Sequence, residues 1–299
     1  MLDHATVSQG SRSMLSPQLS SNSLMAFQLT SEHEQEALAF LAERPLHTTI
    51  MAGFIRDHGL VSPLNRGNFY GCRDHLGRLK GIALIGHATL VEARVDAALD
   101  ALARVAQGVP TAHMMLGEQE EIGQFWNYYA QDGESPRLLH RELLYEQRWP
   151  VEVRETVEGL RLATPEDLKL IIPAHAQMVF EESRVNPLTE DPMGFRMRCA
   201  RRIEQGRTWV LVEGGGLIFK ADVVAATPEA TYIEGVYVNI EEREKGYGTR
   251  CLSQLSKRLL EDTSSICLLV NEQNRKAQAM YQKVGFKLRG YYDSIYLQR

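Results

Sequence analysis

Thr231–Arg250 reads TYIEGVYVNIEEREKGYGTR, and this stretch determines the fold prediction. Its first part is rich in β-branched and aromatic residues without helical periodicity, which predicts a strand over residues 232–240. From Thr249 onward, leucines recur at helical spacing, which predicts a helix. The glycine-containing turn Arg243–Gly248 therefore lies at the N-terminus of that helix.

A helix N-terminus behind a glycine turn is suited to binding phosphate. Its first amides lack helical partners, and the peptide dipoles sum to partial positive charge there. Gly246 and Gly248 lack the Cβ that would keep a ligand from the backbone, and Arg243 and Lys245 add positive charge. A dinucleotide fingerprint needs a third glycine, where Cys251 stands, and no Walker Gly-Lys-Ser/Thr is present. A tight turn without a ligand is the alternative.

A second pattern follows downstream. Residues 265–270 read as an apolar strand and residues 274–284 as a helix. Asn274 and Tyr281 are seven residues apart, so they lie on one face of this helix, about 10 Å apart along its axis. One ligand can contact both.

These segments resemble the GNAT superfamily of acyl-CoA-dependent N-acetyltransferases. GVYVNIEEREKGYGTR resembles its pyrophosphate-binding segment, and NEQNRKAQAMYQKVGF resembles its second signature. The resemblance covers about residues 160–299, and IFKADVVAATPEATYIEGVYV is similar to a bacterial subgroup that carries an extra N-terminal domain of uncharacterised function. Two departures are Ile240, where the superfamily often has Pro, and Glu244, where Gly is usual. Neither removes a donor or blocks the loop glycines.

The resemblance implies acetyl-CoA as co-substrate and a primary amine of a small molecule as acceptor, attacked directly in a ternary complex. It implies that one set of residues binds acetyl-CoA: Val236, Val238, Arg243, Glu244, Lys245, Gly246, Tyr247, Gly248, Thr249 and Asn274. It also implies the fold, α/β (α+β) with tandem GNAT-like domains. Each domain would have a mixed, mostly antiparallel sheet flanked by helices.

Acyl transfer to an amine needs a base and an acid. An alkyl ammonium with a pKa of about 10.4 must lose a proton before it attacks a thioester. Glu234 is the candidate base, because it shares strand parity with Val236 and Val238, whose backbone is expected to pair with the pantetheine arm and polarise the thioester oxygen. Tyr281 is the candidate proton donor to the leaving thiolate. The alternatives are a solvated or ion-paired strand carboxylate and a packed aromatic ring.

One acidic segment is a candidate for binding the acceptor amine. The segment EESRVNPLTEDP (residues 181–192) lies where GNAT enzymes commonly contact acceptors, and its carboxylates Glu181, Glu182, Glu190 and Asp191 can attract a cationic amine. An acidic surface loop is the alternative. A protein lysine or N-terminal acetyltransferase and a catalytically silent acyl-CoA sensor also remain open.

Composition narrows the function classes. The 299 residues carry a net charge of −5, which argues against a nucleic-acid surface. The four cysteines and nine histidines show no metal-ligand or disulfide spacing, so we expect no metal and reduced, packed thiols. No apolar run is long enough to span a membrane, so a cytoplasmic location without membrane contact is expected. Arg196, Arg198, Arg201 and Arg202 are expected on the solvated face of a helix.

The predicted organisation is a disordered tail (1–26), a degenerate GNAT-like domain (27–150) and a catalytic domain (151–299). In the first domain, helices are predicted at 31–44, 45–58, 95–106 and 118–130, and strands at 68–73, 79–86, 113–116 and 138–149. An offset of 154 aligns Gly117-Glu-Gln with Asn271-Glu-Gln.

The same offset predicts what the first copy lacks. It places Glu92 and Arg94 opposite the loop glycines, Glu120 opposite Asn274 and Asn127 opposite Tyr281. An acidic side chain in the loop repels phosphate, so the first copy is expected not to bind CoA. It would support the second domain or a homodimer, or wall the acceptor pocket.

Overall fold

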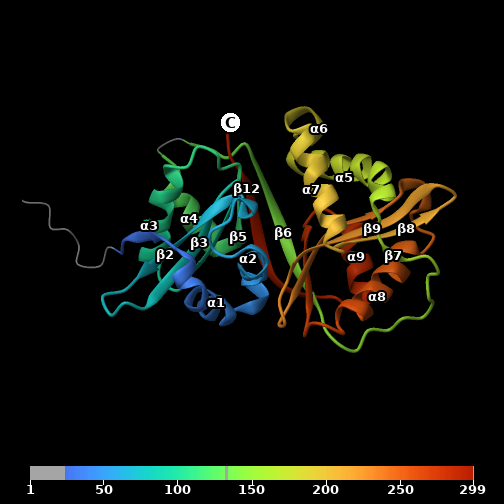
Figure 1. Ribbon diagram of the computed structural model, residues 1–299, viewed down its shortest axis with the longest axis horizontal. Helices are drawn as coiled ribbons and strands as arrows, with labels where there is room; N and C mark the ends of the chain where they lie inside the picture. Colours follow the sequence, from blue (N-terminus) through green and yellow to red (C-terminus); the bar gives the residue numbers. More distant parts are fainter. Residues whose placement is uncertain (1–23, 132–133, 299) are drawn as a thin grey trace, which may run out of the picture.

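The computed structural model describes residues 24–131 and 134–298, and Figure 1 shows two halves joined along one continuous sheet. Most of the predicted tail lies outside the described residues, and its last residue, Ala26, begins the first strand. In the described ranges, no helix is both long and apolar enough to cross a bilayer. All four cysteines are described, and each is buried with a free thiol, as expected.

The elements of the first half are β1 (Ala26–Gln28), α1 (Glu34–Ala42), α2 (Pro45–His58), β2 (Gly67–Arg73), β3 (Leu79–Gly86), β4 (Ala88–Ala93), α3 (Asp96–Gln107), β5 (Met114–Glu118), α4 (Gln119–Tyr129) and β6 (Leu138–Gln147). Those of the second half are β7 (Arg161–Leu162), α5 (Leu168–Ser183), α6 (Pro187–Glu190), α7 (Pro192–Glu204), β8 (Thr208–Glu213), β9 (Gly216–Ala226), β10 (Thr231–Val238), α8 (Tyr247–Leu259), β11 (Ile266–Asn271), α9 (Arg275–Val284) and β12 (Lys287–Tyr296). Short 3₁₀ turns lie at Ser31–His33, Pro63–Asn65, Pro165–Asp167 and Ile240–Glu242. Strands β1, β4, β7 and β12 and helix α6 were not predicted.

The order of the strands shows an exchange between the halves. It reads β1-β2-β3-β4-β5-β12-β6-β11-β10-β9-β8-β7, so the last strand of each half lies beside the fifth strand of the other. β12 pairs with β5, and β6 pairs with β11 from Ile266↔Gln147 to Asn271↔Glu142. β6 and β12 pair with each other at the centre, where they run side by side (Figure 1). Neither half has a complete sheet of its own, and the division at residue 150 stays a prediction.

Helices cover both faces of this sheet. In the first half, α3 and α4 pack against one apolar face, and α1 and α2 cover the other. In the second half, α8 and α9 lie on one face, and α5 and α7 lie on the other. Helix α2 also contacts β9 and β10. It approaches so closely that a Cβ on Gly53 would lie 2.6 Å from Cβ of Ala225, and it therefore closes the junction between the halves.

The predicted alignment of the two copies is wrong in its register. Helices α3 and α8 begin at Asp96 and Tyr247, which are 151 residues apart, and Glu92 lies inside β4, where it pairs with Ile82. Only two residues connect β4 to α3, whereas Asn239–Gly246 connects β10 to α8. The first half therefore has no counterpart of the glycine loop, which is a stronger reason for a degenerate copy than one acidic residue.

Candidate active site

A separation between two parallel strands opens the second half. β10 and β11 pair only at Thr231↔Ile266 and Tyr232↔Cys267. Beyond these positions β10 stays paired with β9, while β11 stays paired with β6, so the two strands diverge. The backbone of β10 that faces the gap is left available to an extended ligand.

A β-bulge interrupts β10 in this separated part. Glu234 is opposite Asp222, but Tyr237 is opposite Lys220, so β10 has one extra residue, and Gly235 takes a φ of +61°. The bulge moves Val236 to the face covered by α8, while Glu234 stays on the face covered by α7. The prediction that Glu234 shares a face with Val236 and Val238 is therefore wrong, because the bulge reverses the alternation.

The connection from β10 to α8 has the expected form. Gly246 is the N-cap of α8 with a φ of +84°, and the N–H of Arg250 donates to its carbonyl at 3.1 Å. The amides of Tyr247, Gly248 and Thr249 precede the first helical bond and face the N-terminal end of the helix. Glu244 has a φ of +66°, a left-handed conformation that favours glycine. The departure from the superfamily pattern at this residue therefore carries backbone strain.

Carboxylates of this loop pair with two nearby lysines. Nζ of Lys245 lies 2.9 Å from Glu242, and Nζ of Lys276, from α9, lies 2.9 Å from Glu244. Nε of Arg243 donates to the carbonyl of Val238 at 3.2 Å. The pair of Lys276 is largely exposed and that of Lys245 partly exposed, and such pairs are individually weak. A phosphate at the helix N-terminus can compete for these cations.

Gly248 lies in a closely packed place that could not be predicted from the sequence. It is buried in the first turn of α8, and a Cβ there would lie 2.6 Å from Sδ of Met280 and 3.1 Å from Cγ2 of Val238. A larger residue here would force Met280 and Val238 to shift, so the packing of α8 on α9 and β10 favours glycine. The expectation that Gly248 also makes room for a ligand stays a prediction.

Asn274 and Tyr281 lie on α9 as predicted. The side chain of Asn274 caps the helix by accepting from the N–H of Ala277 at 3.1 Å. Tyr281 is buried, with its ring centroid 5.8 Å from that of Phe286 and 6.3 Å from that of Tyr145. Burial raises the pKa of Tyr281, so its hydroxyl stays protonated at neutral pH, as a proton donor requires.

Three carboxylates lie near one another, Glu142 of β6, Glu182 of α5 and Glu234 of β10; we call them the acidic group. Glu142 accepts from Oγ of Ser294 at 2.6 Å, and Glu182 accepts from Oη of Tyr296 at 3.2 Å. Partial withdrawal from water and the carboxylates of Glu142 and Glu234 raise the pKa of Glu182 to about 7. Burial also raises the pKa of Glu142. An acidic group of this kind favours a cationic partner.

The other predicted acceptor residues are used differently. Glu181 accepts from Gln177 of the same helix at 2.9 Å. Asp191 caps α7 and pairs with Arg198 at 2.9 Å. Arg202, expected on a solvated face, instead lies 2.8 Å from the buried Asp222 and 3.4 Å from Glu234. Sequence reasoning missed Glu142, although a carboxylate within an apolar strand was a signal.

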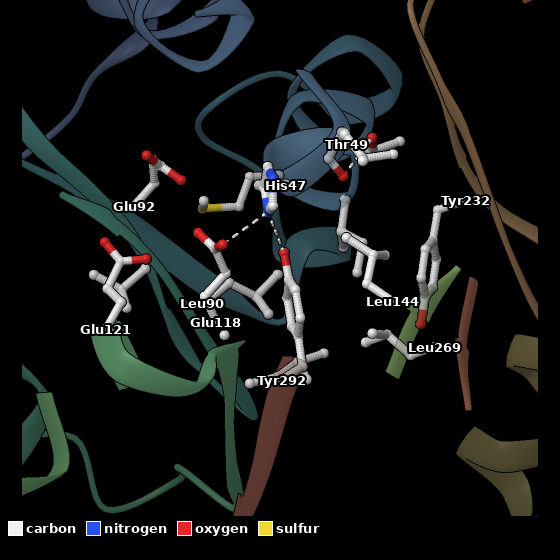
Figure 2. A pocket seen from close by; sticks show the side chains of 16 residues that line it. His47, Thr49, Leu90, Glu92, Glu118, Glu121, Leu144, Tyr232, Leu269 and Tyr292 are labelled. Carbon is white, nitrogen blue, oxygen red and sulfur yellow. Dashed lines mark hydrogen bonds and ion pairs between the residues drawn. The ribbon is translucent and has the colours of Figure 1, made fainter. Parts of the chain in front are cut away.

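The first half shows what a closed version of the same strand separation looks like (Figure 2). β4 and β5 pair in parallel at three positions from Ala88↔Met114 to Leu90↔Leu116 and then diverge. The cavity between them and α2 is only about 30 Å³, room for one or two waters. His47 lines this cavity, with Nδ1 at 2.9 Å from Oη of Tyr292 and 3.3 Å from Glu118.

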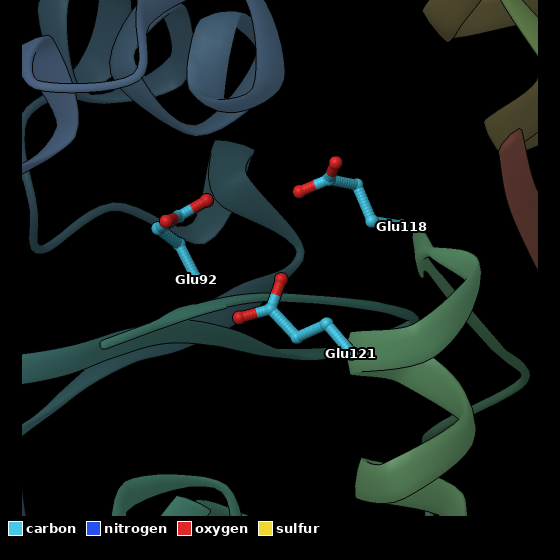
Figure 3. A group of neighbouring side chains, drawn as sticks. All are labelled: Glu92, Glu118 and Glu121. Carbon is cyan, nitrogen blue, oxygen red and sulfur yellow. The ribbon is translucent and has the colours of Figure 1, made fainter. Parts of the chain in front are cut away.

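Figure 3 shows Glu92, Glu118 and Glu121 converging beside this cavity, with oxygens within 4.8 Å of one another. This is metal-like spacing, but cations of the protein already serve the group. Arg44 pairs with Glu92 at 3.0 Å and also with Glu118. Glu121 accepts from the N–H of Ala93, at the end of β4, at 2.6 Å. These side chains therefore close the separation from inside the protein.

Comparisons with known proteins agree with this geometry. Residues 219–294 match the family model described as FR47-like protein. No curated protein matches the chain. The GNAT-family acetyltransferase from Colwellia psychrerythraea is 13% identical with a TM-score of 0.59, and the alignment covers 92% of this chain and 99% of that one.

Two further solved structures cover both halves of the chain. A tandem GNAT protein from the clavulanic acid biosynthesis pathway is 14% identical with a TM-score of 0.55, and a Drosophila protein is 10% identical with a TM-score of 0.68. Each alignment covers 92% of this chain and 99% of the other. At these identities the likeness is one of fold. The chain therefore has the fold of these tandem proteins, and its FR47-like segment lies in its second half.

Proposed function

We propose that the second half is an acyl-CoA-dependent N-acetyltransferase, which transfers an acetyl group from acetyl-CoA to a primary amine of a small molecule. The observation that carries this proposal is the divergence of β10 and β11 in front of the N-terminus of α8. The equivalent separation in the first half is closed by Glu121 and His47, whereas Gly246 and the exposed cations border the second.

The binding residues have distinct tasks. The backbone of Val236 and Val238 lies along the gap and can pair with the amides of a pantetheine arm. The free amides at the start of α8, with Lys245 and Lys276 nearby, suit the pyrophosphate. Asn274 orients α9 so that Tyr281 lies two turns farther along the same helix.

The acidic group supplies the chemistry of the acceptor. Glu234 is ion-paired with Arg202 and lies in a group of carboxylates that can attract an ammonium. Glu182, with its pKa of about 7, is better matched to taking a proton near neutral pH. We assign proton acceptance to Glu182 and ammonium binding to Glu234. Tyr281 protonates the departing thiolate.

The test is acetyl-CoA-dependent thiol release with polyamines, amino acids, aminoglycosides and lysine peptides. The blank is the Lys245→Glu/Lys276→Glu variant, because a substitution at Gly248 would disturb the packing of α8. Lys257→Glu, on an exposed position of α8, is the matched control. Release with small cationic amines that is lost in the blank and kept in the control supports the proposal.

Other outcomes identify the alternatives. Release with lysine peptides alone would replace the small-molecule acceptor by a protein. Saturable binding of acetyl-CoA without release from any acceptor would favour a sensor module, and no binding would contradict the proposed function altogether.

A further inference from the structure

Two opposite charges are buried side by side beneath the candidate site. Lys220 and Asp222 of β9 are each 1% exposed, and the ammonium donates to the carboxylate. Asp222 also accepts from Oγ1 of Thr208 at 2.8 Å and from Nη1 of Arg202 at 2.8 Å. Despite burial, Lys220 and Arg202 hold the pKa of Asp222 well below its usual range, so the carboxylate is ionised.

Stability alone does not explain a buried ion pair. Desolvation of two charges commonly cancels their attraction, and apolar replacements of similar volume are often neutral or stabilising. The ammonium of Lys220 has a further contact outside this ion pair. Nζ of Lys220 also donates to the carbonyl of Gly235 at 3.3 Å, and Gly235 is the bulge residue of β10.

The bulge and the ammonium fit each other closely. Gly235 has a φ of +61°, and a Cβ there would lie 2.8 Å from Nζ of Lys220 and 3.1 Å from Oδ2 of Asp222. A side chain at this residue would collide with both charges. Arg202 additionally pairs with the preceding residue, Glu234, at 3.4 Å. Helix α7 and strand β9 thus hold two consecutive residues of β10 at the point where its alternation reverses.

The direction of one peptide group follows from this contact. In a planar trans peptide, the carbonyl of Gly235 and the N–H of Val236 point in opposite directions. Since the carbonyl points to Nζ of Lys220, the N–H points away from this ammonium, and beyond Tyr232 strand β10 is no longer paired with β11. A cation on the carbonyl also polarises the peptide and strengthens its N–H as a donor.

The reaction needs a donor at this place. When the amine nitrogen bonds to the thioester carbon, the carbonyl oxygen becomes an oxyanion until the carbon–sulfur bond breaks and the thiolate leaves. The proton of the amine passes to the base, and the thiolate takes one from the acid. We propose that Lys220, held by Asp222, is a positioning residue that aims the N–H of Val236 at the thioester oxygen; this inference rests on the proposed function.

The hydrogen bond from the N–H of Val236 to the thioester oxygen can be tested by infrared spectroscopy. The infrared carbonyl stretch of acetyl-CoA, labelled with carbon-13 at the carbonyl, is measured when bound to the wild type, to Lys220→Met and to Lys257→Met. We expect a shift to lower frequency in the wild type and in Lys257→Met, and a smaller shift in Lys220→Met. Affinity for CoA without the acetyl group should change by less than about twofold, while kcat falls at least about tenfold.

A second variant separates positioning from folding. Lys220→Met/Asp222→Asn removes both charges and keeps an acceptor for Thr208 and Arg202, so it avoids an unpaired buried carboxylate. We expect it to fold, bind CoA and lack the carbonyl shift. A wild-type shift in either folded variant would overturn the positioning role and leave the proposed function intact. Failure of the wild type to bind acetyl-CoA would overturn both.

Discussion

Oε1 of Glu234 lies 3.4 Å from Nη2 of Arg202, so the carboxylate that the sequence offers as a base is the partner of a guanidinium. Glu182 belongs to the same acidic group, but its pKa is raised to about 7. The two carboxylates therefore differ in their surroundings: Glu234 pairs with a cation, whereas burial and other carboxylates raise the pKa of Glu182. We therefore assign binding of the ammonium to Glu234 and acceptance of its proton to Glu182.

Glu182→Gln is expected to change the pH dependence of turnover. The base must be ionised to accept a proton, and a carboxylate with a pKa of about 7 becomes ionised as pH rises through that value. Wild-type kcat should therefore rise between about pH 6 and about pH 8, and the variant should lose this rise together with at least about tenfold in kcat. Glu234→Gln should mainly raise KM for a cationic acceptor. An unchanged pH profile in Glu182→Gln would refute this assignment.

Glu244→Gly is expected to stabilise the protein and tighten acetyl-CoA binding. Glycine relieves the left-handed backbone at φ +66°, worth about 1 kcal/mol in the free energy of unfolding. It also frees Lys276 from a competing carboxylate. Glu241→Gly is the matched control, because it removes the same charge from a neighbouring 3₁₀ turn without a positive φ. Thermal denaturation and calorimetric titration compare the two; a lower Tm for Glu244→Gly than for the control would contradict the strain argument.

Tyr281→Phe is expected to lower kcat and leave affinity for acetyl-CoA nearly unchanged. The ring keeps its contacts with Tyr145 and Phe286, and only the hydroxyl that protonates the thiolate is lost. Tyr145→Phe serves as the control, since its hydroxyl accepts from Gln282 at 2.9 Å in the same core. Steady-state kinetics with direct titration separates the effects. Equal losses of turnover and affinity would exclude the acid role.

The exchanged strands predict which fragments fold. A fragment of residues 151–298 lacks β5 and β6, so β11 loses one of its two neighbours and β12 loses both partners. We expect this fragment not to unfold cooperatively, whereas residues 134–298, which retain β6, should show a thermal transition by circular dichroism. Cooperative unfolding of the shorter fragment would show that the predicted boundary at 150 delimits an autonomous domain.

The local features of the site could be predicted from sequence because they depend on nearby residues. The change from β-branched residues to helically spaced leucines located β10 and α8, and Asn274 begins α9 as expected. The bulge also had a local signal, since an isolated glycine within a strand often marks one. The parity assigned to Glu234 ignored Gly235 and was wrong for that reason.

Long-range features could not be predicted in this way. The sequence of β6 predicts a strand, but it does not predict that this strand pairs with β11 rather than with β5. Lys220 and Asp222 were not singled out from the sequence, and their partner Arg202 comes from a different element. Such contacts are set by the assembled fold, as is the role of Glu142.

The binding of acetyl-CoA to the second half can be measured by calorimetric titration into the wild type, Lys245→Glu/Lys276→Glu and the Lys257→Glu control. We expect one bound molecule per chain in the wild type, because the first half is closed. We also expect at least about tenfold weaker binding in the double variant, where phosphate loses two cations, and wild-type binding in the control. Absence of binding, two bound molecules per chain, or equal affinity in all three proteins would contradict these expectations.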